Sequence, residues 1–333
     1  MSTRIYSIPD NCAQYHECIV AWGYLNYLPN VAANALFVAL FFIGLVAQAF
    51  LGWRHRTWGF STALVLGIIL EVVGYGGRIG LHYNVFTQTW FIMYLCCLTL
   101  APAFFSAAVY LSLSRLLAIY GEGLCYFKGR TITLTFILCD FVSLVLQAAG
   151  GAIASTAQTH ERRNMGVNIM IAGLSSQVAA TTAFSLLCLH IMWNLRKNPS
   201  KINPATEDFR RGKAIRMFIW AIVIATATIL ARCSFRVAEL SEGFKGALAN
   251  DEVLYMIFEA VMMVICVFVL TVGHPGLTLG NYWNIGEFHW RQGRNREIEK
   301  QHHQTHGHAV TSEVVEAESY TPSSGDSSEH KTN

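Results

Sequence analysis

The sequence is dominated by seven apolar blocks, each long enough to cross the hydrocarbon core of a bilayer as a helix. Such a crossing takes about 20 predominantly apolar residues, and hydrophobic residues make up 53% of the 333-residue chain. Only 14% of the residues are charged, whereas soluble domains carry about 25%. We therefore predict an all-α membrane protein, a seven-transmembrane helix bundle with spans at 31–52, 60–80, 90–119, 131–155, 167–193, 214–240 and 252–272.

The charges between the blocks predict the orientation of the bundle. Lys and Arg are concentrated in alternate loops, around 54–56, 128–130 and 196–213, and the intervening loops hold few of them. Because positively charged loops stay on the cytoplasmic side, we expect the N-terminus outside and the C-terminus in the cytoplasm.

The two ends of the chain differ in composition from the predicted membrane domain at 31–275. Residues 1–30 are expected to form an extracellular segment, in which Cys12 and Cys18 either form a disulfide or stay free. Residues 276–333 are rich in Ser, Glu, Gln and His and poor in apolar residues. That composition is typical of disorder, so we expect a disordered cytoplasmic tail.

Charged and amide residues interrupt the predicted spans. A charged side chain near the bilayer centre costs from about 3 kcal/mol upward, so it persists where it is paired, hydrated or functional. The predicted topology places most of these residues in the outer half of the bundle, with Glu71 near the midplane and Asp140 deeper. Our candidates for substrate binding or translocation are Glu71, Arg78, Asp140, Gln147, Gln177, Arg232, Arg236, Glu239 and Glu259.

A purely structural role is the alternative for any single candidate. Ion pairs that only fix helix register are possible within two spans, Glu71 with Arg78 and Arg236 with Glu239. For the whole set we favour function, because five spans bring polar residues to one level, and small or neutral residues assemble a bundle at lower cost. Pro102 removes one backbone hydrogen bond from the third span and is expected to bend it.

The motifs of most enzyme and nucleic-acid-binding classes are missing. No HExxH, Gly-rich phosphate loop or GxSxG occurs, so we expect no enzyme, no cofactor and no bound metal. The histidines between 302 and 308 lie in the predicted tail, where metal binding is usually adventitious. A net charge of +3 without a basic patch argues against a nucleic-acid partner. The expected partners are membrane lipids or amphiphilic small molecules.

Six motifs stand out in order along the chain: EVVGYGGR (71–78), APAFFSAAVYLSLSR (101–115), DFVSLVLQAAGG (140–151), GVNIMIAGLSSQ (166–177), RCSFRVAE (232–239) and HPG (274–276). Together they resemble the fungal lipid-translocating exporter family, which includes the aminocholesterol-resistance protein and the sphingoid long-chain-base exporter. The resemblance covers residues 27 to about 276. It implies a seven-span plasma-membrane protein that exports or flips amphipathic lipids and confers resistance to toxic amphiphiles.

Two functions fit these observations. The first is a translocator of amphipathic lipids or toxic amphiphiles, sphingoid-base-like or sterol-like, whose head group enters the outer polar cluster. Acidic residues there would face a cationic amine, and the arginines would pair with them or bind an anionic head group. The alternative is a seven-span lipid or stress sensor, which fits the basic third cytoplasmic loop and the Ser- and Thr-containing tail.

Overall fold

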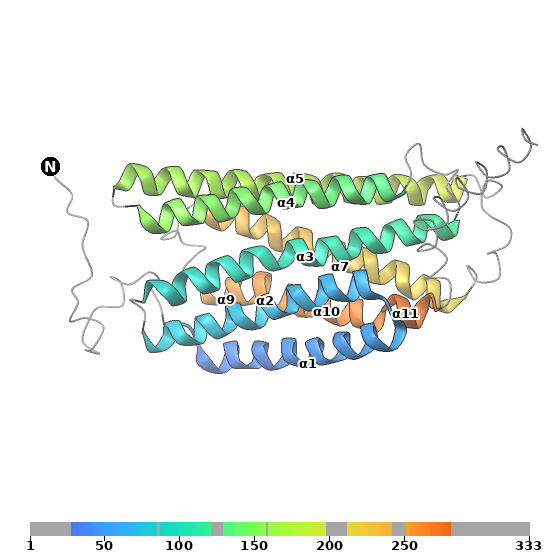
Figure 1. The fold of residues 1–333 in the computed structure, drawn as a ribbon, viewed down its shortest axis with the longest axis horizontal. Helices are drawn as coiled ribbons and strands as arrows, with labels where there is room; N and C mark the ends of the chain where they lie inside the picture. Colours follow the sequence, from blue (N-terminus) through green and yellow to red (C-terminus); the bar gives the residue numbers. More distant parts are fainter. Residues whose placement is uncertain are drawn as a thin grey trace, which may run out of the picture. The chain divides into compact units, whose positions relative to one another are not determined.

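Antiparallel helices form one bundle in the computed structural model, which describes residues 28–84, 87–120, 129–157, 159–197, 212–241 and 251–280 (Figure 1). Six helices are continuous: α1 (Val31–His55), α2 (Trp58–Tyr83), α3 (Gln88–Tyr120), α4 (Gly129–Thr156), α5 (His160–Lys197) and α7 (Lys213–Ser241). A composite seventh covers 252–272. All seven are long and apolar enough to cross a membrane. The predicted all-α class and helix count are confirmed.

The seventh span consists of three consecutive helical parts. α9 (Glu252–Tyr255) begins at Asp251, whose carboxylate caps the helix by accepting hydrogen bonds from the backbone N–H groups of Val253 and Leu254. The π-helical turn η6 (Met256–Val261) follows, and α10 (Met262–Val272) completes the span. A π-helical turn inside an α-helix is frequently found at functional sites. Here it carries one of the candidate residues, Glu259.

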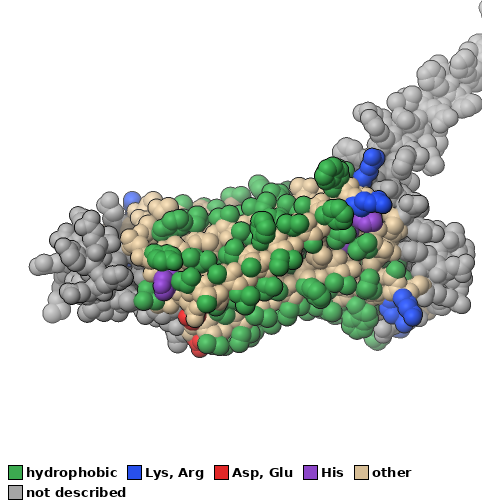
Figure 2. Space-filling view, turned by 90° about the horizontal axis from the view of Figure 1, so that it is seen from below, with side chains coloured by type: hydrophobic (Ala, Val, Ile, Leu, Met, Phe, Trp, Pro, Cys, Tyr) green, Lys and Arg blue, Asp and Glu red, His purple; other side chains and the backbone are tan. Residues whose placement is uncertain are grey.

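The outer surface has the character of a lipid-facing one. Large apolar side chains are exposed along the middle of the helices, for example Phe42 and Ile43 on α1 and Phe141 on α4. Figure 2 shows apolar side chains over the middle of one face, with Lys and Arg side chains gathered at one end. An extensive exposed apolar surface of this kind indicates contact with a membrane.

The chain stays ordered past the predicted start of the tail. Residues 275–278 form the short helix α11 (Pro275–Thr278), which packs against α1 and α7. The ring Nδ1 of His274 accepts a hydrogen bond from the N–H of Gly276 at 3.0 Å. A Cβ at Gly276 would collide with His55, so only glycine fits. The boundary predicted at 276 is too early, because the closing HPG motif belongs to the bundle.

The remaining predictions for the two ends fall outside the described residues. These are the extracellular segment up to residue 27, with Cys12 and Cys18, and the tail from residue 281 onward.

Glycines allow the backbones of α4 and α5 to contact each other directly. A Cβ at Gly150 would lie 2.6 Å from the backbone nitrogen of Met170 and 2.7 Å from the carbonyl oxygen of Gly166. A Cβ at Gly166 would lie 2.5 Å from the backbone nitrogen of Ala154. Membrane helices use small residues in this way, because direct packing replaces the hydrophobic driving force that lipid removes.

Two neighbouring glycines test this packing. Gly150→Ala forces the two backbones apart, whereas a Cβ at Gly151 meets only the sulfur of Met170 at 3.7 Å, an ordinary contact. We expect Gly150→Ala to lower the melting temperature of the detergent-solubilised protein. Gly151→Ala should be neutral, or stabilising by up to about 1 kcal/mol through helix propensity. Equal melting temperatures for the two variants would contradict the close approach.

Candidate ionic site inside the bundle

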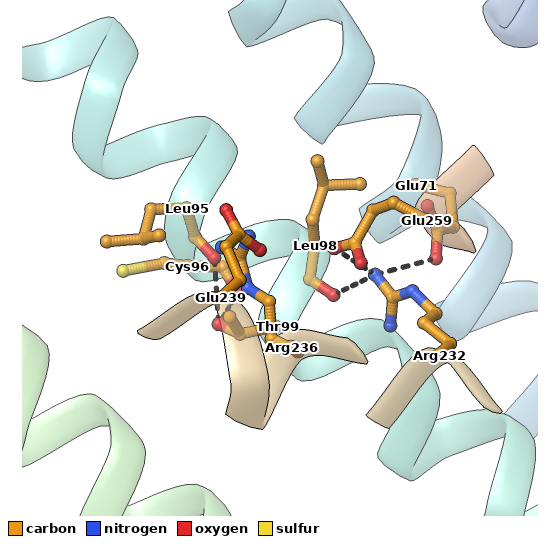
Figure 3. Close-up of polar contacts among 9 residues, drawn as sticks. All are labelled: Glu71, Leu95, Cys96, Leu98, Thr99, Arg232, Arg236, Glu239 and Glu259. Atoms are coloured by element: carbon orange, nitrogen blue, oxygen red, sulfur yellow. Dashed lines mark hydrogen bonds and ion pairs between the residues drawn. The ribbon is translucent and has the colours of Figure 1, made fainter. Parts of the chain in front are cut away.

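At the centre of the site, one guanidinium contacts two carboxylates from different helices (Figure 3). Nη2 of Arg232 on α7 lies 3.0 Å from Oε1 of Glu259 on η6 and 3.6 Å from Oε1 of Glu71 on α2. The three residues are 2%, 1% and 0% exposed, respectively. We call them the Arg232 triad. With all three groups ionised, the triad carries one more negative charge than positive.

A proline supplies the third contact of Arg232. In an α-helix the N–H of each residue bonds to the carbonyl four residues earlier, so Pro102, which lacks an N–H, leaves the carbonyl of Leu98 without its helical donor. Nη2 of Arg232 donates to that carbonyl at 2.5 Å. The gap in the α3 hydrogen-bond ladder thus becomes part of the site.

A second ion pair lies on the next turn of α7. Nη1 of Arg236 donates to Oε2 of Glu239 at 2.7 Å, and both residues are buried. This is one of the two pairs that the sequence suggested. The other does not form as suggested, because Glu71 is paired with Arg232 and not with Arg78, two turns along its own helix.

Arg78 is held by the first and seventh spans. Its Nε donates to the side-chain oxygen of Asn34 on α1 at 3.2 Å. Its guanidinium carbon lies 3.9 Å from the ring centroid of Tyr255 on α9, a cation–π contact. Because Tyr255 directly precedes η6, Arg78 supports the same segment that carries Glu259.

The two candidate glutamines connect α4 and α5. Nε2 of Gln147 donates to Oε1 of Gln177 at 3.0 Å, and both side chains are buried. Gln177 also borders a cavity of about 10 Å³ beside the Arg232 triad, which is about the space that one water molecule needs. This cavity leaves little free space beside the triad. The cavity is lined by Leu98, Thr99, Pro102, Leu174, Gln177, Arg232, Cys233, Arg236 and Glu259.

Asp140 lies apart from these contacts. It is 3% exposed on α4 and sits beside the hydroxyls of Tyr110 and Ser106 on α3. Among the residues that the structure describes, neither of its carboxylate oxygens has a hydrogen-bond partner. The sequence predicts that Asp140 lies deeper than the outer group, and the structure gives it different neighbours from those of the Arg232 triad.

Sequence reasoning missed several contributors to the site. Asn34 on the first span is fully buried against Arg78. An amide within an apolar span was the available signal. Tyr255, whose ring contacts Arg78, has no charged or amide group that would have marked it. The carbonyl of Leu98 has no side-chain signal at all, and only Pro102, four residues later, points to it.

The fold and the buried charges define a seven-helix membrane protein with an ionic site in its core. The RTA1-like protein family model matches residues 64–282, and the chain belongs to this family. It is 31% identical to the sphingoid long-chain base transporter RSB1 of Saccharomyces cerevisiae over 281 residues, 76% of this chain and 73% of that protein. The resemblance inferred from the six motifs is confirmed.

Two further yeast relatives match a smaller part of the chain. The chain is 30% identical to protoporphyrin uptake protein 1 of Saccharomyces cerevisiae over 209 residues, 62% of this chain and 66% of that protein. It is 28% identical to protein RTM1 of the same organism over 211 residues, 63% of this chain and 65% of that protein. No solved structure matches the chain.

The triad makes a direct prediction about stability. Arg232→Met leaves Glu71 and Glu259 facing each other without a cation, and breaking a buried pair on one side costs about 3–5 kcal/mol. We expect a large loss of folded protein in detergent, measured by size-exclusion chromatography after heating. Arg162→Met, the same change on the exposed start of α5, should behave like the wild type.

A variant in which the triad is uncharged distinguishes the effect of charge on stability from the effect of packing. The triple variant that combines Arg232→Met with Glu71→Gln and Glu259→Gln has no charge left in the triad and should recover much of the lost stability. If Arg232→Met alone is as stable as the wild type, the triad does not hold the bundle together.

Proposed function

We propose that this protein translocates amphipathic lipids that carry a cationic amine, such as sphingoid-base-like molecules. The observation that carries the proposal is the Arg232 triad, in which two buried carboxylates share one guanidinium. An entering ammonium group supplies the missing positive charge and up to three hydrogen-bond donors. The apolar tail meanwhile stays in the surrounding lipid.

The relatives support the class of cargo more than its identity. One is named as a transporter of sphingoid long-chain bases and another as a protoporphyrin uptake protein. Since these names cover different molecules, the head-group preference has to come from the site. A sterol-like cargo with a neutral hydroxyl would not balance a carboxylate, so we rank cationic amines above sterols.

The head group has to enter through a movement of the helices, since the cavity beside the triad has room for about one water molecule. Both irregular helix segments lie at the triad: η6 carries Glu259, and Pro102 frees the carbonyl that Arg232 binds. Helices bend most readily at prolines and π-helical turns. We infer that these two segments open the site.

The cellular setting follows from the same proposal. The basic loops favour a cytoplasmic C-terminus and an external N-terminus. With this orientation, Arg232 and Glu259 are expected in the outer half of the bundle and Glu71 near the midplane. A protein of the plasma membrane that moves toxic amphiphiles outward would confer resistance to them. A lipid or stress sensor with the same fold remains the second candidate, favoured by the small size of the cavity beside the triad.

Export of a labelled sphingoid base from cells tests the proposal. Cells that express Glu259→Gln or Glu71→Gln should release the base more slowly than cells with the wild type, because each change removes the carboxylate charge that attracts the amine. Glu161→Gln, the same change on the exposed first turn of α5, is the matched control and should export normally.

Two outcomes would contradict the proposal. Equal release with and without the protein, across several cationic amphiphiles, would remove transport and leave the sensor as the better reading. Faster release of a labelled sterol than of the amine would retain transport and reject the head-group assignment.

A further inference from the structure

The buried carboxylate of Asp140 differs from every other acidic group in the bundle core that the structure describes. Glu71, Glu239 and Glu259 each contact an arginine, whereas none of the ion pairs among the described residues includes Asp140. Asp140 lies beside Ser106 of α3, and Arg232 contacts Leu98 of the same helix. Ser106 and Leu98 are two turns apart, or about 12 Å at 1.5 Å per residue. Asp140 therefore forms a site of its own, beyond contact distance of Arg232.

The serine and threonine hydroxyls near Asp140 and Tyr110 donate their protons to backbone carbonyls. Ser106 donates to the carbonyl of Pro102 at 2.7 Å, and Ser143 donates to the carbonyl of Cys139 at 3.0 Å. Thr181 of α5, which lies beside Tyr110, donates to the carbonyl of Gln177 at 2.9 Å. Each of these hydroxyls can therefore present only lone pairs to a neighbour. The phenol of Tyr110, which has no hydrogen-bond partner among the described residues, is the hydroxyl beside Asp140 that can still donate.

Few titratable groups face Asp140 from the helices packed against α4. α3 contributes Tyr110, α7 contributes Cys233, and α5 contributes the neutral hydroxyl of Thr181, which faces Tyr110. The Tyr110 ring packs against Phe136 and Phe184, with ring centroids 5.5 and 4.5 Å away, so the side of the site that these rings cover is apolar. An ionised carboxylate would be buried there without counter-charge, which is strongly unfavourable.

We propose that Asp140 is a proton-binding site, and that its proton is the ion exchanged during transport. The protonated carboxyl carries no charge and therefore needs no counter-charge, and its O–H can donate to one of the neighbouring lone pairs. When the bundle opens and water enters, the O–H bond breaks, the electron pair stays on the carboxylate, and the proton passes to that water. Proton binding rests on Asp140 alone, while its coupling to transport rests on the proposed function.

Infrared spectroscopy of the full-length protein in detergent tests proton binding without any cargo. A protonated carboxylic acid has a C=O stretching band distinct from that of carboxylates. We expect Asp140→Asn to remove part of this band and to keep the melting temperature of the wild type, because Asn closely matches the neutral acid. Asp251→Asn, the same change at an exposed helix cap where Asn serves equally well, should leave the band intact.

An unchanged acid band in Asp140→Asn overturns the proposal. So does a large loss of stability in that variant, which would show that the ionised form is the one that the fold requires.

Flux measurements in liposomes test coupling separately. The full-length protein is reconstituted with a pH-sensitive dye inside, and a fluorescent sphingoid base is added with or without a pH gradient. With the wild type, we expect base movement to respond to the gradient and to change the internal pH. Asp140→Asn should lose both responses and still bind the base at equal pH, whereas Glu259→Gln should lose binding.

The possible failures are distinguishable. If Asp140→Asn keeps gradient-dependent movement of the base, the coupling role is wrong and transport stands. If the wild type moves no base although the acid band is present, the proposed function fails and proton binding stands.

Discussion

The contact between Arg232 and its three partners is the interaction on which the core of this bundle depends. A guanidinium in the hydrophobic interior is tolerated only when charge and hydrogen bonds compensate for lost water. Glu71 and Glu259 provide the charge, and the carbonyl of Leu98 provides a further acceptor. Because these partners come from α2, η6 and α3, a single side chain of α7 fixes four segments relative to one another.

Arginine suits this position better than lysine would. Its guanidinium stays charged under all physiological conditions, whereas the pKa of a lysine shifts readily on burial. A single nitrogen of the guanidinium, Nη2, contacts both carboxylates and the carbonyl. In the proposed function, a cationic head group would join these contacts and supply the positive charge that two carboxylates lack beside one guanidinium.

The sequence predicted the number of helices and the positions of the charged residues, because both follow from hydropathy along one chain. It could not predict which charges meet. Periodicity places Glu71 and Arg78 on one face of α2, yet the cation that contacts Glu71 comes from α7. Helix rotation and neighbour order decide such pairs, and neither is encoded in the spacing of a single helix.

Other features escaped sequence reasoning for different physical reasons. The π-helical turn at Glu259 results from a shift in backbone hydrogen bonding, and no residue type in the sequence predicts such a shift. The end of the bundle was placed too early because composition changes near Pro275, whereas the packing of α11 continues to Thr278. Composition is averaged over a window of many residues, so it cannot detect a helix of only one turn such as α11.

Pro102 gives the two acidic sites a shared element. Its missing N–H frees the carbonyl of Leu98 for Arg232, and its own carbonyl accepts the hydroxyl of Ser106, which lies beside Asp140. A change in the bend of α3 at this residue would alter both environments together. Residues with two available arrangements are the physical basis on which separate sites become coupled. A proline in the ladder between the sites is therefore the place where head-group binding and proton release can influence each other.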